Sequence, residues 1–146
     1  MAEEGRVSLD GPILDTNVVL RFLRKDEVQH AAARTLFEQA AASGQRLVLL
    51  DVVVAEIIFV LRSFYKCTRS EAAESMLGLL DHQAVGTATP GILRDALARY
   101  AATNLHFVDC YLAAMGKAAD REVCTFDQGL AKFGDVRVIG GDKGEA

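Results

Sequence analysis

Hydrophobic residues in this chain gather into short continuous runs that alternate with longer amphipathic segments. The runs with the length and character of buried strands are residues 13–14, 47–50, 123–126 and 136–139. Strands that are apolar along their whole length are buried on both faces, which is typical of parallel sheets covered by helices. The pattern therefore predicts an α/β domain with a mostly parallel sheet of about four to five strands flanked by helices.

Helices are expected between these runs, and several carry sequence signals at their ends. Gly44 is placed to end a helix over residues 27–43, and Thr68 with Glu71 forms a capping box for a helix that runs to Leu80. Pro90 suits the first turn of a helix that runs to Ala102. The remaining segments are an extended stretch at 83–88 and helices over 16–23, 51–64, 109–119 and 127–132, with Thr16 and Asp51 as expected caps.

The composition fits one soluble cytoplasmic domain. The chain has 146 residues, of which 51% are hydrophobic, and a net charge of −4, which excludes a disordered chain. No uncharged apolar run approaches the roughly 18 residues of a membrane span, and residues 1–10 lack the apolar core of a secretory signal. The three cysteines are widely spaced, so neither a disulfide framework nor a zinc site is expected. We expect one domain at 12–139, with short flexible ends at 1–11 and 140–146.

Four acidic residues stand where ordinary surface charges are not expected. Asp15 and Asp127 follow predicted strands, at the sheet edge where ligands of α/β proteins bind. Glu56 and Asp109 interrupt apolar helices, and Glu56 is expected on a buried face. Each acid has a structural alternative: helix capping for the first two, the helix dipole for Asp109 and a basic partner for Glu56. Together, and without a nearby His or Cys cluster, they suit a hard cation such as Mg²⁺ or Mn²⁺.

The segments around these acids resemble the four motifs of the PIN-domain nucleases, specifically those of VapC-type toxins from bacterial toxin–antitoxin pairs. Residues 14–20 (LDTNVVL) resemble the first motif and residues 54–57 (VAEI) the second. Residues 108–114 (VDCYLAA) and 125–127 (TFD) resemble the third and fourth. The resemblance covers residues 12–139 in the order of the family, and it implies a single PIN-like α/β domain.

The resemblance also implies a metal-dependent endoribonuclease that inhibits growth by cleaving RNA. It makes Asp15, Glu56, Asp109 and Asp127 the catalytic residues and the ligands of Mg²⁺ or Mn²⁺. Asn17 and Thr125 would support them, with turn or cap hydrogen bonds as the alternative. The partners implied are an RNA substrate, a VapB-type antitoxin and a second copy of the chain in a homodimer. A bound divalent cation offsets part of the acidic charge, so the net charge of −4 does not exclude RNA.

Basic and aromatic residues after the first two motifs are candidates for RNA contacts. Phe64 and Tyr65 could stack on bases, and the basic residues could contact phosphates. Core packing and solvated helix ends are the structural alternatives. The basic candidates are Arg21, Arg24, Lys25, Arg62, Lys66 and Arg69.

Two other functions are consistent with part of the pattern. A phosphatase of the haloacid-dehalogenase type also begins with an acid at a strand end. It needs a second acid two residues later, where this chain has Asn17. The other alternative is a catalytically inactive PIN-like binding module, which metal binding would distinguish from a nuclease. His30, His82 and His106 lack metal-ligand spacing and are expected in surface or core roles.

Overall fold

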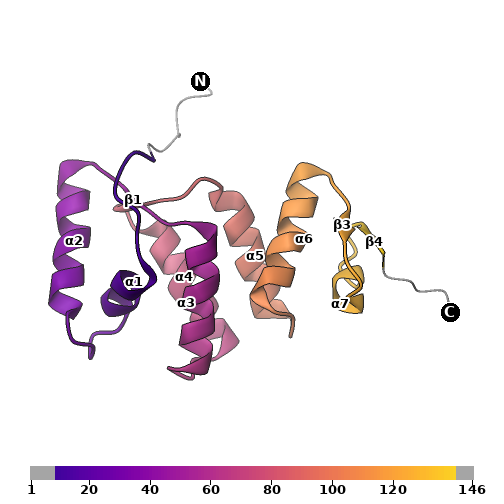
Figure 1. Ribbon diagram of the computed structural model, residues 1–146, viewed down its shortest axis with the longest axis horizontal. Coiled ribbons are helices and arrows are strands. Elements are labelled where there is room, and N and C mark those ends of the chain that lie inside the picture. The colour runs from indigo at the N-terminus through magenta and orange to yellow at the C-terminus, as the bar shows by residue number, and fades with distance from the viewer. Residues whose placement is uncertain (1–8, 141–146) are drawn as a thin grey trace. The chain divides into compact units, whose positions relative to one another are not determined.

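The computed structural model describes residues 9–140, which form two compact units, residues 9–90 and 91–140. The predicted flexible ends fall mostly outside the described residues. The first unit contains α1 (Thr16–Leu23), α2 (His30–Ser43), β1 (Leu47–Val48), α3 (Asp51–Ser63), α4 (Arg69–Asp81) and β2 (Val85–Gly86) (Figure 1). The second contains α5 (Pro90–Ala102), which begins at the boundary, α6 (Phe107–Ala119), β3 (Val123–Cys124), α7 (Gln128–Ala131) and β4 (Val138–Ile139).

All strand pairing in residues 9–140 is parallel, which confirms the predicted α/β class. In the first unit, β1 pairs with β2 on one side and forms a bridge from Val48 to Ile13 on the other. In the second unit, β3 pairs with β4, with Val123 opposite Val138.

Within residues 9–140 the strands form two two-stranded ladders, fewer strands together than the four to five expected in one sheet. The ladders are also shorter than the apolar runs that predicted them: residues 49–50 and 125–126 lead into the next helix, and residues 136–137 precede β4. Leu49, for example, is only 1% exposed although it lies beyond β1.

Most helix ends follow the sequence signals, but the helix predicted over 27–43 begins at His30, and two expected caps are wrong. Thr68 Oγ1 accepts a hydrogen bond from the Glu71 amide at 3.0 Å, and the Glu71 side chain accepts one from the Thr68 amide at 2.8 Å. Gly44 ends α2 with a left-handed φ of 76°.

The expectation that Thr16 and Asp51 are caps is wrong, because each is the first helical residue of its helix. The cap position and the first helical position are neighbours in the sequence. Residue preference alone therefore does not show at which of the two positions a helix begins.

In the core of the first unit, α1 packs against two other helices. α1 contacts α2 and α3, and α3 packs on α4 (Figure 1). Phe37 of α2 is 1% exposed and stacks on Phe22 of α1, with ring centroids 3.8 Å apart. The ring of His82 meets both phenylalanines edge-on, which confirms a core role for this histidine. The aromatic packing of Phe22 thus fixes one side of α1 against the core.

In the second unit, a buried arginine ties α5 to the segment after α7. The side chain of Arg99 is only 10% exposed and forms ion pairs with Asp95 at 3.0 Å and Asp135 at 2.7 Å. Its guanidinium also lies 4.7 Å from the centre of the Phe133 ring. The hydrogen bond from Arg99 lowers the pKa of Asp135 below its ordinary value, and burial opposes this shift in part.

This ion pair predicts that acid weakens the fold. Because the pKa of Asp135 is lower in the folded chain than the ordinary value of about 3.9, its stabilising contribution is complete near neutral pH. The contribution is lost as the pH falls below about 4. Since Asp135 is 43% exposed, we expect Asp135→Asn to cost no more than about 1 kcal/mol at pH 7. Urea unfolding of both proteins between pH 7 and pH 3 should show this difference shrinking, and a constant difference would contradict it.

No helix within residues 9–140 combines the length and apolar character needed to cross a bilayer.

Candidate functional site

Asp15 and Glu56 lie on two helices that begin after neighbouring parallel segments. α1 follows residues 13–14 and α3 follows β1, and these two segments are bridged in parallel. Parallel segments end at the same edge of a sheet, so the first turns of α1 and α3 begin there together. The two helices contact each other. The sheet therefore brings two of the four predicted acids to one place.

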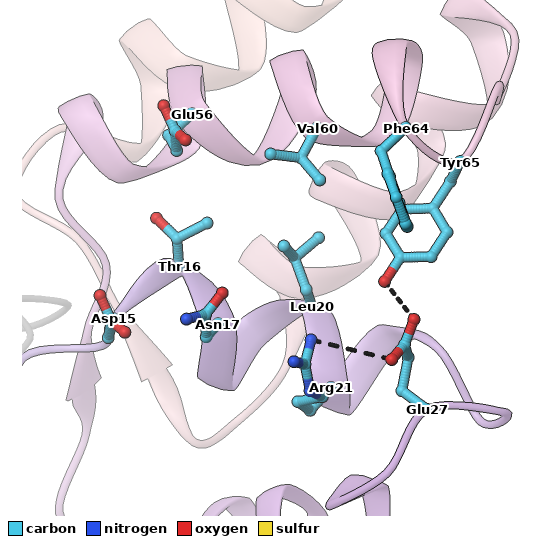
Figure 2. A pocket seen from close by; sticks show the side chains of 10 residues that line it. All are labelled: Asp15, Thr16, Asn17, Leu20, Arg21, Glu27, Glu56, Val60, Phe64 and Tyr65. Carbon is cyan, nitrogen blue, oxygen red and sulfur yellow. Dashed lines mark hydrogen bonds and ion pairs between the residues drawn. The ribbon is translucent and has the colours of Figure 1, made fainter.

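The two acids line one end of an elongated pocket in the first unit, with a volume of about 550 Å³. Figure 2 shows the Asp15 and Glu56 carboxylates at this end, which we call the carboxylate end. Leu20 and Val60 form an apolar middle (Figure 2). The opposite end, which we call the aromatic end, is formed by Arg21, Glu27, Phe64 and Tyr65, and Thr16 and Asn17 complete the lining.

Neither carboxylate at the carboxylate end has a hydrogen-bond or ion-pair partner among residues 9–140. Asp15 occupies the cap position of α1 without a side-chain capping bond, so helix capping does not explain it. Asn17 lines the same pocket, but within the described part of the chain its amide makes no hydrogen bond to Asp15. Two carboxylates are thus left with their oxygens available.

The expectation that Glu56 lies on a buried face is wrong. Glu56 is exposed, and the apolar residues that share its side of α3 are exposed as well: Val52 by 71% and Phe59 by 65%. Helical spacing correctly grouped these residues on one face, but spacing does not determine whether that face turns toward the core. α3 instead buries the opposite face, which includes Ile57 and Leu61.

Asp109 and Asp127 belong to the second unit. Asp109 lies half-buried in the first turn of α6, and no residue of the described range 9–140 pairs with its carboxylate. Asp127 caps α7, because its Oδ1 accepts a hydrogen bond from the Gly129 amide at 2.8 Å. Thr125 Oγ1 accepts one from the Asp127 amide at 2.9 Å. The structural alternatives proposed for Asp127 and Thr125 are therefore confirmed as interactions of this turn.

The donor set at the carboxylate end fits a hard divalent cation. It offers carboxylate, hydroxyl and amide oxygens and no sulfur or imidazole, which is the chemistry that Mg²⁺ and Mn²⁺ prefer. Within residues 9–140, no three His, Cys, Asp or Glu side chains gather closely enough to form a metal cluster. The fit therefore rests on the two unpaired carboxylates and their neighbouring polar side chains.

At the aromatic end, Glu27 connects Arg21 and Tyr65. Glu27 lies 3.9 Å from the Arg21 guanidinium and accepts a short hydrogen bond from the Tyr65 hydroxyl (Figure 2). This hydrogen bond is the main reason that the pKa of Tyr65 is raised. His30 Nδ1 lies 2.8 Å from the carbonyl oxygen of Arg21, so it donates to that oxygen. The sequence does not predict this role for Glu27, because a lone acid at the start of a predicted helix is typical of an ordinary surface charge.

Arg24 and Arg62 contact the segment after α3, and neither lines the pocket directly. The Arg24 guanidinium lies 4.5 Å from the centre of the Tyr65 ring, and Arg62 donates to the Cys67 carbonyl oxygen at 2.8 Å. Lys25 and Lys66 are exposed. Of the basic residues proposed for RNA contacts, Arg21 is the one that lines this pocket.

Comparison with known proteins identifies the family. The profile of the PIN domain matches residues 13–136, so the chain belongs to the PIN-domain family. The chain is also similar to the VapC ribonuclease of Aquifex aeolicus (strain VF5), with 26% identity over 123 residues. The alignment covers 84% of this chain and 91% of the relative. These findings confirm the resemblance carried by the four motifs, and family membership removes the phosphatase alternative.

Proposed function

We propose that the chain is an endoribonuclease that hydrolyses RNA phosphodiester bonds with the help of Mg²⁺ or Mn²⁺. The observation that carries the proposal is the pair of unpartnered carboxylates, Asp15 and Glu56, at one end of a pocket at the sheet edge. The similarity to a VapC ribonuclease supports RNA as the substrate. A PIN-like binding module without catalysis is the alternative that the experiment below would reveal.

The proposed chemistry divides the work between the two carboxylates. Asp15 would hold the cation, and Glu56 would orient the attacking water and accept its proton. A P–O bond forms to the water oxygen while the P–O bond to the leaving ribose oxygen breaks, and solvent water protonates that oxygen. When bound, the cation lowers the pKa of a water molecule and neutralises charge on the phosphate oxygens. Because both carboxylates are exposed, they are accessible to a polymeric substrate.

The proposal extends to Asp109 and Asp127 as further metal ligands, with Thr125 and Asn17 in support. Their motifs and their order along the chain support these roles. Asp109, like Asp15, has no partner among residues 9–140 and so keeps its oxygens available. Asp127 uses one oxygen to cap α7, which fixes the direction of the carboxyl group.

We also propose that the chain acts as the toxin of a toxin–antitoxin pair, with a VapB-type antitoxin and a second copy of itself as partners. The exposed apolar side chains of α3, Val52 and Phe59, support a protein contact on that helix. The apolar residues of α4, in contrast, are buried in the core, and Met76 is 0% exposed. They are therefore not available for a contact with another protein.

Removal of the metal is the test of the proposed function. We expect a chelator to reduce RNA cleavage by the purified chain to background, and an excess of Mg²⁺ or Mn²⁺ to restore it. The reason is that water without a metal ion has a pKa of about 15.7, too high for a carboxylate to remove its proton near neutral pH. Gel analysis of a labelled single-stranded RNA measures cleavage, and calorimetric titration measures ion binding. Cleavage that persists in chelator would contradict the proposal. Absence of both ion binding and cleavage would identify the inactive binding module.

A further inference from the structure

The aromatic end of the pocket has the features of a second binding position that the two carboxylates do not use. It is continuous with the carboxylate end through Leu20 and Val60 (Figure 2). Arg21 follows Asp15 by six positions along α1, a rise of roughly 9 Å. A phosphate held at the carboxylate end and one held at Arg21 would thus be different phosphates of the same strand.

The guanidinium of Arg21 makes no hydrogen bond to another residue of the range 9–140. Its Nε is buried and has no hydrogen-bond partner in the described residues. Its ion pair with Glu27 is long at 3.9 Å, whereas charge-assisted hydrogen bonds measure about 2.7–2.9 Å. Glu27 is meanwhile committed to the hydroxyl of Tyr65. Glu27 therefore keeps the guanidinium at the pocket while the two Nη groups make no hydrogen bond within residues 9–140. A phosphate can accept from both Nη groups in the bidentate manner that suits arginine, whereas the buried Nε is out of its reach.

Phe64 provides a flat apolar surface beside Arg21. Its side chain is 70% exposed although it follows directly on α3. Tyr65 supports it edge-on, with ring centroids 4.9 Å apart and planes at 87°. Tyr65 is itself fixed by Glu27 and by Arg24, whose guanidinium lies 4.5 Å from its ring centre. An exposed ring that is held by a fixed neighbour is a stacking platform for an unpaired base.

We propose that the aromatic end is a subsite for the nucleotide next to the one that is cut, with its phosphate on Arg21 and its base stacked on Phe64. This inference rests on the proposed ribonuclease function. It makes single-stranded RNA the substrate class, because bases in a duplex are already stacked and cannot cover Phe64. Stacking does not read base edges, so this subsite contributes affinity and orientation rather than sequence preference.

Binding measured without metal tests the subsite separately from cleavage. In chelator, fluorescence anisotropy of a short labelled single-stranded RNA should show Phe64→Leu weakening binding by about 5- to 100-fold. Arg21→Gln should weaken it by about tenfold and flatten the plot of log affinity against log salt by roughly 0.7. Leu36→Ala and Arg34→Gln are the controls on α2, since Leu36 is an apolar side chain that is 47% exposed and Arg34 is an exposed arginine. Neither control residue lines the pocket.

An RNA with one abasic position supplies the second arm of the test. When the abasic position falls at the subsite, it should weaken binding to the parent chain but add little to the effect of Phe64→Leu. Additive losses would contradict the stacking contact, as would equal effects of Phe64→Leu and Leu36→Ala on RNA binding. Sedimentation of Phe64→Leu checks the remaining possibility: a changed oligomeric state would make Phe64 part of a protein contact and overturn the subsite.

The outcomes separate this inference from the proposed function. If the parent chain cleaves RNA but Arg21→Gln and Phe64→Leu bind like their controls, the subsite is wrong and the nuclease stands. If both variants lose RNA binding but the parent chain never cleaves with Mg²⁺ or Mn²⁺, the proposed function is wrong and the pocket is an RNA-binding site. In cleavage assays, loss of the subsite should raise KM more than it lowers kcat, because neither residue lies at the carboxylate end.

Discussion

Asp15→Asn should reduce RNA cleavage by at least about 100-fold and leave the fold intact. The substitution removes one of two carboxylates at the carboxylate end, and loss of even an indirect support of a metal ion costs about 10- to 100-fold. The side chain is exposed and makes no capping hydrogen bond, so the amide replaces nothing that the fold needs. We therefore expect the free energy of unfolding to change by no more than about 0.5 kcal/mol.

The matched control is Asp26→Asn, which makes the same change at an exposed aspartate between α1 and α2 that does not line the pocket. Initial rates of RNA cleavage in saturating Mg²⁺ should fall for Asp15→Asn and stay near the parent value for Asp26→Asn. Urea unfolding should give the same midpoint for all three proteins. If Asp15→Asn retained metal-dependent cleavage, Asp15 would not be a catalytic residue. If it lost cleavage and stability together, the effect would be structural.

Much of this site could be predicted from the chain because it depends on local patterns. Asp15 directly follows Ile13 and Leu14, and because Ile13 is bridged in parallel to β1, Asp15 lies at a sheet edge as predicted. The expected burial of this run holds for Leu14 but not for Ile13, which is 66% exposed. The capping box of α4 is likewise a matter of side chains three residues apart. The class of fold follows from the same kind of pattern, since continuous apolar runs between helices are typical of parallel sheets. The predicted burial of the runs in the second unit is wrong in part, because Phe126 is 87% and Ile139 46% exposed.

What could not be predicted depends on contacts between distant residues. Glu56 shares its face with apolar neighbours, and only tertiary packing decides that α3 turns this face outward. The link between Glu27 and Tyr65 joins residues 38 positions apart, and neither carries a motif. That the Asp15 side chain makes no capping hydrogen bond also required the structure, because aspartate at the start of a helix is usually a cap.

Phe37→Ala should be the most damaging single change to the stability of the first unit. Phe37 is 1% exposed, stacks on Phe22 at 3.8 Å and receives the edge of His82 at 5.4 Å. Truncation of a buried phenylalanine costs about 3–5 kcal/mol, because apolar burial is lost and a cavity is left. Domains are stable by only about 5–15 kcal/mol, so a large part of the total would disappear.

The matched control is Phe59→Ala, the same change on a helix at a side chain that is 65% exposed. It should alter the free energy of unfolding by no more than about 0.5 kcal/mol, since alanine favours helix and little burial is lost. Urea unfolding should show a lower midpoint for Phe37→Ala with an unchanged slope. Equal effects of the two changes would contradict the packing described here.

The functional consequence of Phe37→Ala should depend on temperature. Phe22 lies on α1, the helix that begins beside Asp15 and carries Arg21, so loss of its stacking partner loosens the element that positions both ends of the pocket. Because Phe37 touches neither carboxylate, cleavage should approach the parent rate at low temperature and collapse on warming, as the folded fraction falls. Asp15→Asn should stay inactive throughout the same range. An equal loss of cleavage by Phe37→Ala at every temperature would mean that the core sets the geometry of the carboxylates directly.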